Sequence, residues 1–562
     1  MALADELRSV VKGEVLDDVN TMDAYSRDAS FFRVVPEVVV RPADAQDICA
    51  LVQFVNNKRR ADPKARISLT PRSGGTDMSG GPLGDSIIVD MAHFNRLLEL
   101  GADYAVVEPG MYFRDFDKLT QGRHLELPSY TASREINTLG GMVGNDSGGE
   151  KNLKYGKTAR YVQELEAVLK DGALHTLRPL AGESLQLKLR EAGVEGDVYR
   201  AVARLVATHR PTIAQATPTV TKNSAGYALW DIGDGAQMLN LARLMVGAQG
   251  TLGIITKVKV GLVRPKPFSA MVIMFVKNLS QLGELVPEVL QYQPDSFESY
   301  DDHTFKIAIK YLPELAGQMS AQGRSASGGK DRMGFFQLGF SFLPEIGMLL
   351  LGGVPKLVLI AEFRGDTQDE ALLQAQKLAT DIANDRDHVK VRIAPNERAS
   401  RKYWAVRRES FNLLRKKIRG KRTAPFIDDF VVPPNVLPEF LPRLQEIMGH
   451  YPQLTYTVAG HVGDGNFHII PLIDPKDPTV TKTIDELSHK VYDLVIEYKG
   501  SISGEHNDGL IRTPYVEKMF GPAMMGLFYE IKNIFDPLNI FNPGKKVGTT
   551  FSDALGKLDL PR

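Results

Sequence analysis

The spacing of apolar and polar residues differs between the two halves of the chain. In the first half, residues 38–55 predict a strand, a turn and a helix. Apolar runs at 86–91 and 162–172 predict two more strands, and the apolar positions Ile254, Ile255, Val258 and Val260 predict another. Glycine-rich loops separate these strands.

After Pro267 the pattern changes to short strands that alternate with helices. Strands are expected near 269–276, 357–364, 388–394, 425–432, 454–460 and 467–472, and helices near 280–292, 368–385, 396–416, 436–449 and 479–498. Two strand–helix–strand passes predict an α+β, ferredoxin-like domain. We expect a first domain over 1–266, a second over 267–500, and a C-terminal segment, 501–562, that returns to the first.

Composition limits the classes of function. A chain of 562 residues with 43% hydrophobic and 24% charged residues should form more than one domain of an ordinary soluble protein. Its net charge of zero predicts no general attraction to nucleic acid. Cys49 is the only cysteine, which argues against disulfides and cysteine-ligated iron–sulfur clusters and favours a reducing cytoplasm. The N-terminal sixteen residues suggest an amphipathic helix and no signal peptide.

Three glycine-rich loops lie between the predicted strands of the first half, at 67–85, 138–157 and 246–265. Glycines let backbone N–H groups turn towards one point, and such concave amide arrays bind phosphate oxygens. The loops match neither the P-loop nor the GxGxxG fingerprint. Together they predict a site for one long phosphorylated cofactor.

Two C-terminal motifs carry candidate metal and acid–base residues. His461 and His468 lie in GHVGDGNFH, and Glu505 and His506 lie in GEHNDG. Two imidazoles and a carboxylate, with one coordination position open, are typical of a catalytic metal that acts as a Lewis acid. His506 would then be available to move protons. The alternative is that these histidines are ordinary surface or core residues.

Six segments carry a family resemblance. PRSGGTDMSGG, LGGMVGNDSGG and GAQGTLGIIT resemble the flavin-contacting segments of the FAD-linked oxidase family, which has the vanillyl-alcohol-oxidase (PCMH-type) fold. GHVGDGNFH with GEHNDG, and FDPLNIFNPGK, are similar to its D-2-hydroxy-acid dehydrogenase branch, which includes D-lactate dehydrogenase, the glycolate oxidase flavin subunit and D-2-hydroxyglutarate dehydrogenase. The resemblance implies a PCMH-type FAD domain and an α+β cap.

The resemblance also implies which residues bind FAD. They are Arg72, Ser73, Gly74, Gly75, Thr76, Ser79 and Gly80 at the pyrophosphate, Gly140, Gly141, Gly144, Asn145 and Gly148 along the flavin, Ile254 or Ile255 beside the adenine half, and Asn542 near the isoalloxazine. Many relatives carry a histidine that binds flavin covalently just after the first of these loops. Thr76 and Asp77 occupy that place here, so we expect non-covalent FAD.

The implied activity is oxidation of a D-2-hydroxy acid to the 2-keto acid by hydride transfer to flavin. His506 would be the base, and His461, His468 and Glu505 would hold a divalent metal, with zinc favoured and manganese or iron left open. Arg407, or its neighbour Arg408, would bind the substrate carboxylate together with Asn466. Asn223 and Tyr227 would face the substrate, or would belong to a plain loop.

The chain departs from the family pattern at several positions. Asp429 and Pro433 match an Asp-x-x-x-Pro strand, but Ile427 stands where 2-hydroxyglutarate enzymes often have lysine, and Phe411 replaces a small hydroxyl residue. Arg419, Lys421 or Arg422 could bind a second carboxylate instead. Asn507 and Asp508 replace a commoner glycine and aliphatic residue, which matches a subgroup whose longer members carry iron–sulfur domains.

Two segments bear on the electron acceptor. Residues 333–355 carry one charge and could reach across a bilayer, but Pro344, Glu345 and five glycines favour a buried cap insertion or docking on a membrane or partner. The basic run 415–422 could contact anionic lipid or an acidic redox partner. We therefore expect a quinone or an electron-transfer protein as acceptor, at the inner face of the membrane or in the cytoplasm, and leave a homodimer open. The alternatives are an oxygen-using oxidase of another alcohol and a non-catalytic electron-transfer subunit.

Overall fold

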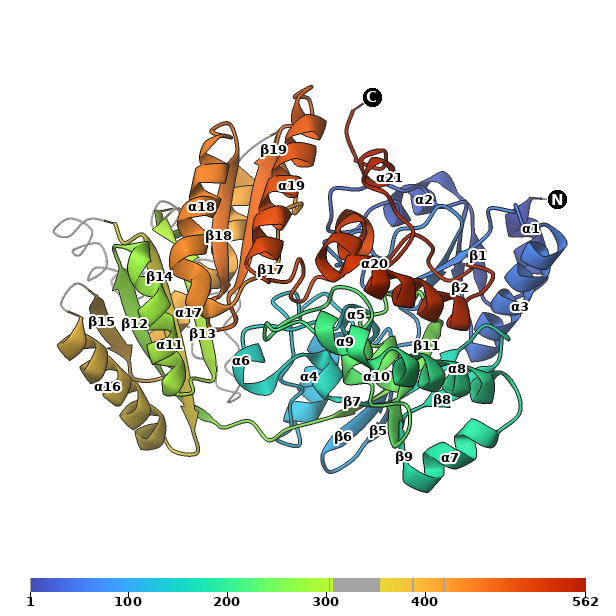
Figure 1. Ribbon diagram of the computed structural model, residues 1–562, viewed down its shortest axis with the longest axis horizontal. Coiled ribbons are helices and arrows are strands. Elements are labelled where there is room, and N and C mark those ends of the chain that lie inside the picture. The colour runs from blue at the N-terminus through green and yellow to red at the C-terminus, as the bar shows by residue number, and fades with distance from the viewer. Residues whose placement is uncertain (1, 303, 307–353, 387–388, 418–419, 562) are drawn as a thin grey trace. The chain divides into compact units, whose positions relative to one another are not determined.

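The computed structural model describes residues 2–302, 304–306, 354–386, 389–417 and 420–561, without the side chains of 385 and 409–417. The chain divides into two compact units (Figure 1). The first unit contains Met1–Pro265, Asp429–Val431 and Val495–Arg562, and the second contains Lys266–Asp428 and Val432–Leu494. The C-terminal residues thus belong to the unit that the N-terminal residues form.

Sheets form the centre of the first unit. One has the strand order β1-β2-β4-β3, with bounds Glu14–Leu16, Val38–Arg41, Ile87–Asp90 and Leu69–Arg72. A second has the order β5-β6-β11-β7-β8, with bounds Leu97–Leu100, Tyr104–Val107, Ile254–Gly261, Val162–Val168 and Leu174–Leu177. A short pair joins β9 (Pro179–Ala181) and β10 (Met238–Asn240). The predicted strands at 86–91 and 254–260 are confirmed, and that at 162–172 is confirmed up to Val168.

Helices surround these sheets. They are α1 Leu3–Arg8, α2 Val19–Tyr25, α3 Ala45–Ala61, α4 Phe113–Gln121, α5 Leu139–Asn145, α6 Asn152–Tyr155, α7 Gly182–Arg190, α8 Val194–Thr208, α9 Arg210–Ala216, α10 Leu241–Met245, α20 Gly509–Phe535 and α21 Phe551–Leu555. Apolar residues of α1 and α3 pack with β2, β3 and β4 in one core. Helix α20 bends at Gly521 and contacts α8 and α9. The C-terminal segment is therefore part of the core of this unit.

The second unit is built on one antiparallel sheet. Its strands β12 (Phe268–Val276), β13 (Ser296–Asp301), β14 (Leu357–Gly365) and β15 (Lys390–Ala394) lie in the order β15-β12-β14-β13. With α11 (Leu282–Gln291) after β12 and α16 (Gln368–Asp385) after β14, this is the ferredoxin-like arrangement that the sequence predicts, but its strand β13 is not among the predicted strands. The sheet continues through β18 (Thr455–His461), β19 (Asn466–Ile473) and β16 (Arg422–Thr423).

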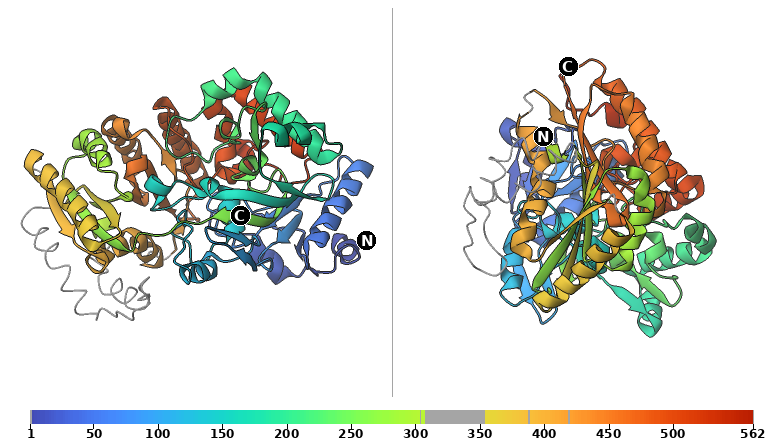
Figure 2. Two further views of the ribbon diagram at one scale, coloured as in Figure 1. Left: turned by 90° about the horizontal axis from the view of Figure 1, so that it is seen from below. Right: turned by 90° about the vertical axis from the view of Figure 1, so that its left-hand side faces the viewer.

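Helices cover both faces of this sheet. Figures 1 and 2 show α11, α16, α18 (Leu437–Gly449) and α19 (Val480–Glu497) on one face and α17 (Glu397–Lys417) on the other. Strands β12, β13 and β14 are accordingly buried at nearly every position, as expected for strands covered on both sides. Arg407 of α17 contacts Glu298 of β13, which also lies beside His461 of β18.

Some predictions for the second half fail or fall outside the described residues. The predicted strand 425–432 is wrong for most of its length, because only Phe430–Val431 (β17) is strand and residues 426–427 form a turn. Residues 333–353 of the segment 333–355, and the side chains of 415–419 in the basic run, lie outside the described part. Within that part, no helix is both long enough and apolar enough to cross a membrane.

Candidate active site

Asp77 and Gln249 join the three glycine-rich loops of the first unit. The Asp77 carboxylate accepts hydrogen bonds from the backbone N–H of Ser79 at 3.1 Å and from the Asn145 amide at 2.7 Å. The Gln249 amide donates to Asn145 Oδ1 at 3.2 Å. Asp77, Asn145 and Gln249 come from the first, second and third loop. Their hydrogen bonds join the three loops into one assembly, as a single shared cofactor requires. Asp77 is one of the two residues, with Thr76, expected at the place of a flavin-linking histidine, and its carboxylate binds other groups of the protein.

Asn542 strengthens the same assembly. Its amide donates to the carbonyls of Gly81 at 2.9 Å and Gln249 at 2.7 Å, and its oxygen accepts from the Thr70 hydroxyl at 3.2 Å. The side chain is 1% exposed. Its proximity to the isoalloxazine stays a prediction. The geometry shows that it holds the first and third loops together.

The predicted glycines differ in what surrounds them. A Cβ at Gly140 would lie 2.4 Å from Pro109 Cβ, and one at Gly74 would lie 2.9 Å from the Ile136 carbonyl oxygen, so both pack against protein. A Cβ at the half-buried Gly144 would meet no atom within 4 Å. Open space beside a helix in the cofactor-binding assembly fits a bound cofactor.

The remaining predicted cofactor residues are mostly tied to protein groups. The Arg72 guanidinium donates to the carbonyls of Tyr25 and Arg27, and Ser73 shares a hydrogen bond with Thr138 at 2.6 Å. Ile254 is fully buried in the core, whereas Ile255 is partly exposed. Of this pair, only Ile255 has the exposure needed to contact a ligand.

The segment that carries Glu505 and His506 is hydrogen-bonded to all three loops. The Asn507 amide donates to the carbonyls of Asn145 at 3.1 Å and Gly247 at 2.8 Å. The N–H of Gly509 donates to Gln249 Oε1 at 2.9 Å, and that of Leu510 donates to the Ser79 carbonyl at 2.8 Å. The candidate base and ligand are therefore held directly against the predicted flavin-binding loops.

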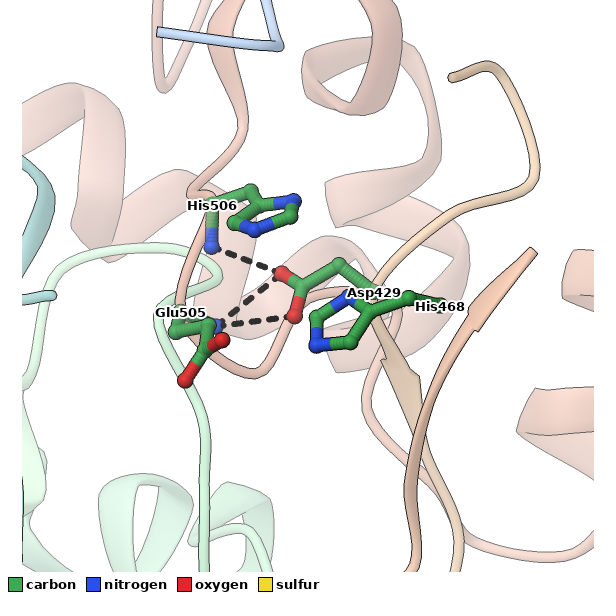
Figure 3. A group of neighbouring side chains, drawn as sticks. All are labelled: Asp429, His468, Glu505 and His506. Atoms are coloured by element: carbon green, nitrogen blue, oxygen red, sulfur yellow. Dashed lines mark hydrogen bonds between the residues drawn. The ribbon is translucent and has the colours of Figure 1, made fainter. Parts of the chain in front are cut away.

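Asp429 shapes the turn at Glu505 and His506. Its carboxylate accepts from the backbone N–H of Glu505 at 3.0 Å, from that of His506 at 2.7 Å, and from the Ser503 hydroxyl at 2.8 Å (Figure 3). Ligand atoms of Asp429, Glu505 and His506 lie within 4.8 Å of one another. Figure 3 also draws His468, which belongs to the second unit. The sequence marks Asp429 only as a family match, because a backbone contact leaves no signal in residue spacing.

The segment 222–227 contributes a different residue from those predicted. Tyr227 is 1% exposed and its hydroxyl bonds Thr251, so it belongs to the core. Asn223 accepts from the Ser501 hydroxyl at 2.6 Å. Lys222 instead reaches Glu505, with Nζ 3.0 Å from Oε2. Tyr227 therefore has no surface for a substrate.

In the second unit, the sheet brings His461, His468 and Asn466 to one face. His461 pairs with Asn466, and His468 pairs with Ala459 two residues before His461, so all three side chains point the same way. The two imidazole rings are 5.3 Å apart between centroids. The glycine-rich motif predicts that the two histidines point to the same side, and the hairpin of β18 and β19 has this geometry.

Buried carboxylates orient both histidines. Glu298 lies 2.5 Å from His461 Nδ1 and also accepts from Arg407 Nε at 3.2 Å. Asp428 lies 3.2 Å from His468 Nδ1. A carboxylate at Nδ1 fixes the tautomer that presents Nε2 as a metal ligand. Neither Glu298 nor Asp428 is predicted from the sequence, because each joins the site only through strand pairing or the turn before β17.

The neighbouring arginines of α17 have different surroundings. Arg407 shares Glu298 with His461, whereas the Arg408 guanidinium lies 4.7 Å from the centre of the Trp404 ring. Trp404 donates its indole N–H to Glu362 at 3.2 Å. Arg407 is therefore the arginine associated with the candidate ligands of this unit.

Several buried lysines in the first unit have shifted pKa values. Burial lowers the pKa of Lys545 to about 7, with repulsion from Lys557 adding to the effect. Burial also lowers the pKa of Lys157, against the attraction of Asp146, and of Lys546, against the attraction of Asp508. Lys157 and Lys546 each form a short ion pair, at 2.8 Å and 3.0 Å, so their charge is compensated within the protein.

Comparison with known proteins identifies the family. The model described as "FAD linked oxidases, C-terminal domain" matches residues 266–546, and the model described as "FAD binding domain" matches residues 36–178. The chain belongs to the FAD-linked oxidase family. Its fold is α+β with a PCMH-type FAD-binding domain, and its matched FAD-binding domain identifies FAD as the cofactor, in agreement with the three joined loops.

Curated relatives of this family member carry three different names. It is 28% identical over 542 residues to the D-2-hydroxyglutarate dehydrogenase of Pseudomonas putida, and covers 50% of that protein. It is 27% identical to a D-lactate dehydrogenase of Archaeoglobus fulgidus, and 25% identical to glycolate oxidase subunit GlcD of Bacillus subtilis, covering 99% and 96% of them. The alignments include 95%, 97% and 96% of this chain. The chain therefore spans about half the length of the D-2-hydroxyglutarate dehydrogenases it matches first.

Solved structures support the fold. A p-cresol methylhydroxylase with bound substrate aligns with a TM-score of 0.67 and 17% identity, over 98% of this chain and 96% of that one. An alkyldihydroxyacetonephosphate synthase aligns with a TM-score of 0.63 and 15% identity, over 96% of this chain and 84% of the other. At these identities the likeness concerns the fold alone.

Proposed function

We propose that this protein is an FAD-dependent dehydrogenase that oxidises a D-2-hydroxy acid to the 2-keto acid. The observation that carries the proposal is the direct bonding of the Glu505–His506 segment to all three flavin-binding loops, through Asn507, Gly509 and Leu510. The names of the curated relatives support the substrate class, since each acts on a 2-hydroxy acid or is named for one. Substrate length stays open among D-lactate, glycolate and D-2-hydroxyglutarate.

Oxidation of the substrate separates a hydride from a proton. The three glycine-rich loops would hold FAD without a covalent link, and the flavin would supply the acceptor for the hydride from the substrate Cα. His506 takes the hydroxyl proton, because imidazole titrates close to neutral pH and can act as a general base there. Asp429 supports this role by fixing the backbone of His506.

A charged anchor binds the substrate carboxylate. We assign this role to Arg407, whose planar guanidinium suits a carboxylate, with the Asn466 amide as a second donor. The contact of Arg407 with Glu298, which also holds His461, supports this choice over Arg408. The shared carboxylate would link substrate binding to the position of His461.

We further propose that His461, His468 and Glu505 hold a divalent metal. The metal would polarise the substrate hydroxyl, and two imidazoles with one carboxylate suit zinc. The donor chemistry fits, since each histidine has a carboxylate at Nδ1 and Glu505 is buried.

Anaerobic reduction of the bound flavin tests the proposal. The purified protein is mixed with D-lactate, glycolate, D-2-hydroxyglutarate or longer D-2-hydroxy acids, and flavin absorbance is followed. At least one of them should bleach the flavin, and His506→Ala should abolish this reduction while FAD stays bound. His489→Ala, which removes a half-exposed histidine of α19, is the matched control. No bleaching by any of these acids in the wild type would contradict the substrate class.

The electron acceptor is a separate part of the proposal. We propose a quinone or an electron-transfer protein. The reduced enzyme should be reoxidised by a soluble quinone analogue much faster than by dissolved oxygen, as measured by stopped-flow absorbance. Faster reoxidation by oxygen would favour an oxidase.

A further inference from the structure

Lys222 makes a buried ion pair with the candidate metal ligand Glu505. The Lys222 side chain is fully buried, Glu505 is 8% exposed at its side chain, and Nζ lies 3.0 Å from Oε2. The two residues are 283 positions apart in the chain. Burying a lysine costs free energy, and the ion pair with Glu505 offsets part of this cost. The arrangement therefore suggests a role for Lys222 at Glu505.

The backbone around Lys222 is held by other groups. Ser224 donates its N–H to the Ser503 carbonyl at 2.9 Å and its hydroxyl to the Gly504 carbonyl at 3.0 Å. The N–H of Gly226 donates to Asp508 at 2.9 Å. These bonds join residues 222–226 to residues 503–508 independently of the Lys222 side chain.

Two other buried lysines reinforce this join. Lys157 Nζ donates to the carbonyl of Asn223 at 2.6 Å and to that of Gly504 at 3.2 Å. Lys546 Nζ donates to the Ser224 carbonyl at 2.8 Å and to Asp508 at 3.0 Å. Lys157 and Lys546 also pair with carboxylates, those of Asp146 and Asp508, whereas Lys222 pairs with the candidate ligand Glu505. Of these three lysines, Lys222 is therefore the one that contacts a candidate metal ligand.

Gly148 limits the movement of the same carboxylate oxygen. A Cβ there would lie 2.9 Å from Glu505 Oε2 and 2.8 Å from Asn152 Oδ1. Oε2 is therefore enclosed by the Lys222 ammonium and the backbone of Gly148. A hydrogen bond from an ammonium to one carboxylate oxygen makes that oxygen a weaker metal ligand, which favours metal binding through the other oxygen.

We infer that Lys222 is a positioning residue that holds Glu505 Oε2 and so makes Glu505 a one-oxygen ligand through Oε1. The inference rests on the proposed metal site. Removal of such a supporting group typically weakens metal binding by about 10–100-fold. Without Lys222, the carboxylate would rotate or bind through both oxygens.

The test compares wild type, Lys222→Met and the control Lys170→Met, each as full-length FAD-containing protein. Lys170 is half-buried and donates to the Ile534 carbonyl, away from Glu505. Metal is removed with a chelator, and Zn²⁺ affinity is measured by competition with a chromogenic chelator. We expect affinity to fall by about 10–100-fold in K222M and to stay unchanged in K170M, with equal FAD content in all three.

A spectroscopic measurement separates positioning from general weakening. The visible spectrum of Co²⁺-substituted protein reports coordination number, and we expect a weaker, higher-coordinate spectrum in K222M. Equal or tighter Zn²⁺ binding, or an unchanged Co²⁺ spectrum, would overturn the role of Lys222. If the wild type binds no stoichiometric Zn²⁺, the proposed metal site is wrong instead.

A structure of the Zn²⁺-loaded wild type decides the same point if K222M does not fold. The inference requires Lys222 Nζ within hydrogen-bond distance of one Glu505 oxygen and the metal on the other. Metal bound by both oxygens, or a displaced Lys222, would contradict it.

Discussion

Asp428 and Asp429 are consecutive residues whose carboxylates serve different units of the protein. Asp428 lies 3.2 Å from His468 Nδ1 in the second unit, and Asp429 accepts from the N–H groups of Glu505 and His506 in the first. Asp429 has a φ of +66°, so the backbone turns sharply between them. Asp428, which orients the candidate ligand His468, is therefore directly bonded in the chain to Asp429, which positions the candidate base His506.

The first prediction concerns Asp429→Ala. It removes a carboxylate that accepts three hydrogen bonds in the turn at Ser503–His506. Because a hydrogen bond to a charged group contributes about 1.5–3 kcal/mol, the free energy of unfolding should fall by at least about 3 kcal/mol. Flavin reduction should be slowed in the fraction that folds. Urea unfolding and stopped-flow absorbance measure the two effects, and an unaltered unfolding midpoint would show that the turn does not depend on Asp429.

The second prediction concerns Glu298→Gln. The amide cannot accept from both His461 and Arg407 as the carboxylate does, so the histidine and the arginine lose a common support. Metal affinity should fall by about 10–100-fold and KM for the hydroxy acid should rise, with FAD content unchanged. Chelator competition and steady-state kinetics with an artificial acceptor measure these quantities. A metal affinity and a KM equal to those of the wild type would show that Glu298 has no role in the site.

The third prediction compares Gly148→Ala with Gly144→Ala. A methyl group at Gly148 would collide with Glu505 Oε2 and Asn152 Oδ1, whereas one at Gly144 would contact no protein atom. G148A should therefore weaken metal binding. G144A should leave the thermal stability of the FAD-free protein intact, because alanine suits a helix better by about 1 kcal/mol, yet weaken FAD binding. Flavin fluorescence titration measures FAD affinity. An unchanged FAD affinity in G144A would show that FAD does not occupy the space beside Gly144.

The fourth prediction concerns the pH dependence of the FAD-free protein. Burial lowers the pKa of Lys545 to about 7, from the usual lysine value of about 10, so between these values the unfolded chain binds more protons than the folded one. The contribution of Lys545 to stability should therefore rise with pH from about 7 to about 10, and be lowest below about 7. The urea midpoint of the wild type, relative to that of Lys545→Met, should therefore rise as pH increases from about 7 to about 10. A constant difference between them across this window would contradict the lowered pKa.

Helices and strands with strong periodicity could be predicted from sequence. Residues 368–385 form a helix with the predicted bounds, begun by the capping box of Thr367 and Glu370. A ferredoxin-like arrangement after Pro267 is predicted as well, and the strand order β15-β12-β14-β13 agrees with it, although β13 is missing from the predicted strands. Each of these features depends on neighbours in the chain.

The prediction fails where long-range contacts outweigh local pattern. The segment 425–432 is predicted as a strand, yet only Phe430–Val431 is strand, and the carboxylates of Asp428 and Asp429 contact His468 Nδ1 and the backbone N–H of Glu505. Asn507, which departs from the family pattern, has a φ of +69° and donates hydrogen bonds to two loop carbonyls. Glycine and asparagine both adopt that backbone conformation readily, but only asparagine has the amide that makes these bonds.

The sequence by itself determined the family, the glycine-rich cofactor loops and the residue types able to bind metal and move protons. It did so because backbone freedom, ligand chemistry and short spacings are local properties. Tertiary structure alone decided that Asp77, Gln249 and Asn542 join the loops, that Glu298 and Asp428 orient the histidines, and that Lys222 holds Glu505. These roles arise when burial forces polar groups far apart in the chain to satisfy one another, and no spacing in the sequence records which groups will meet.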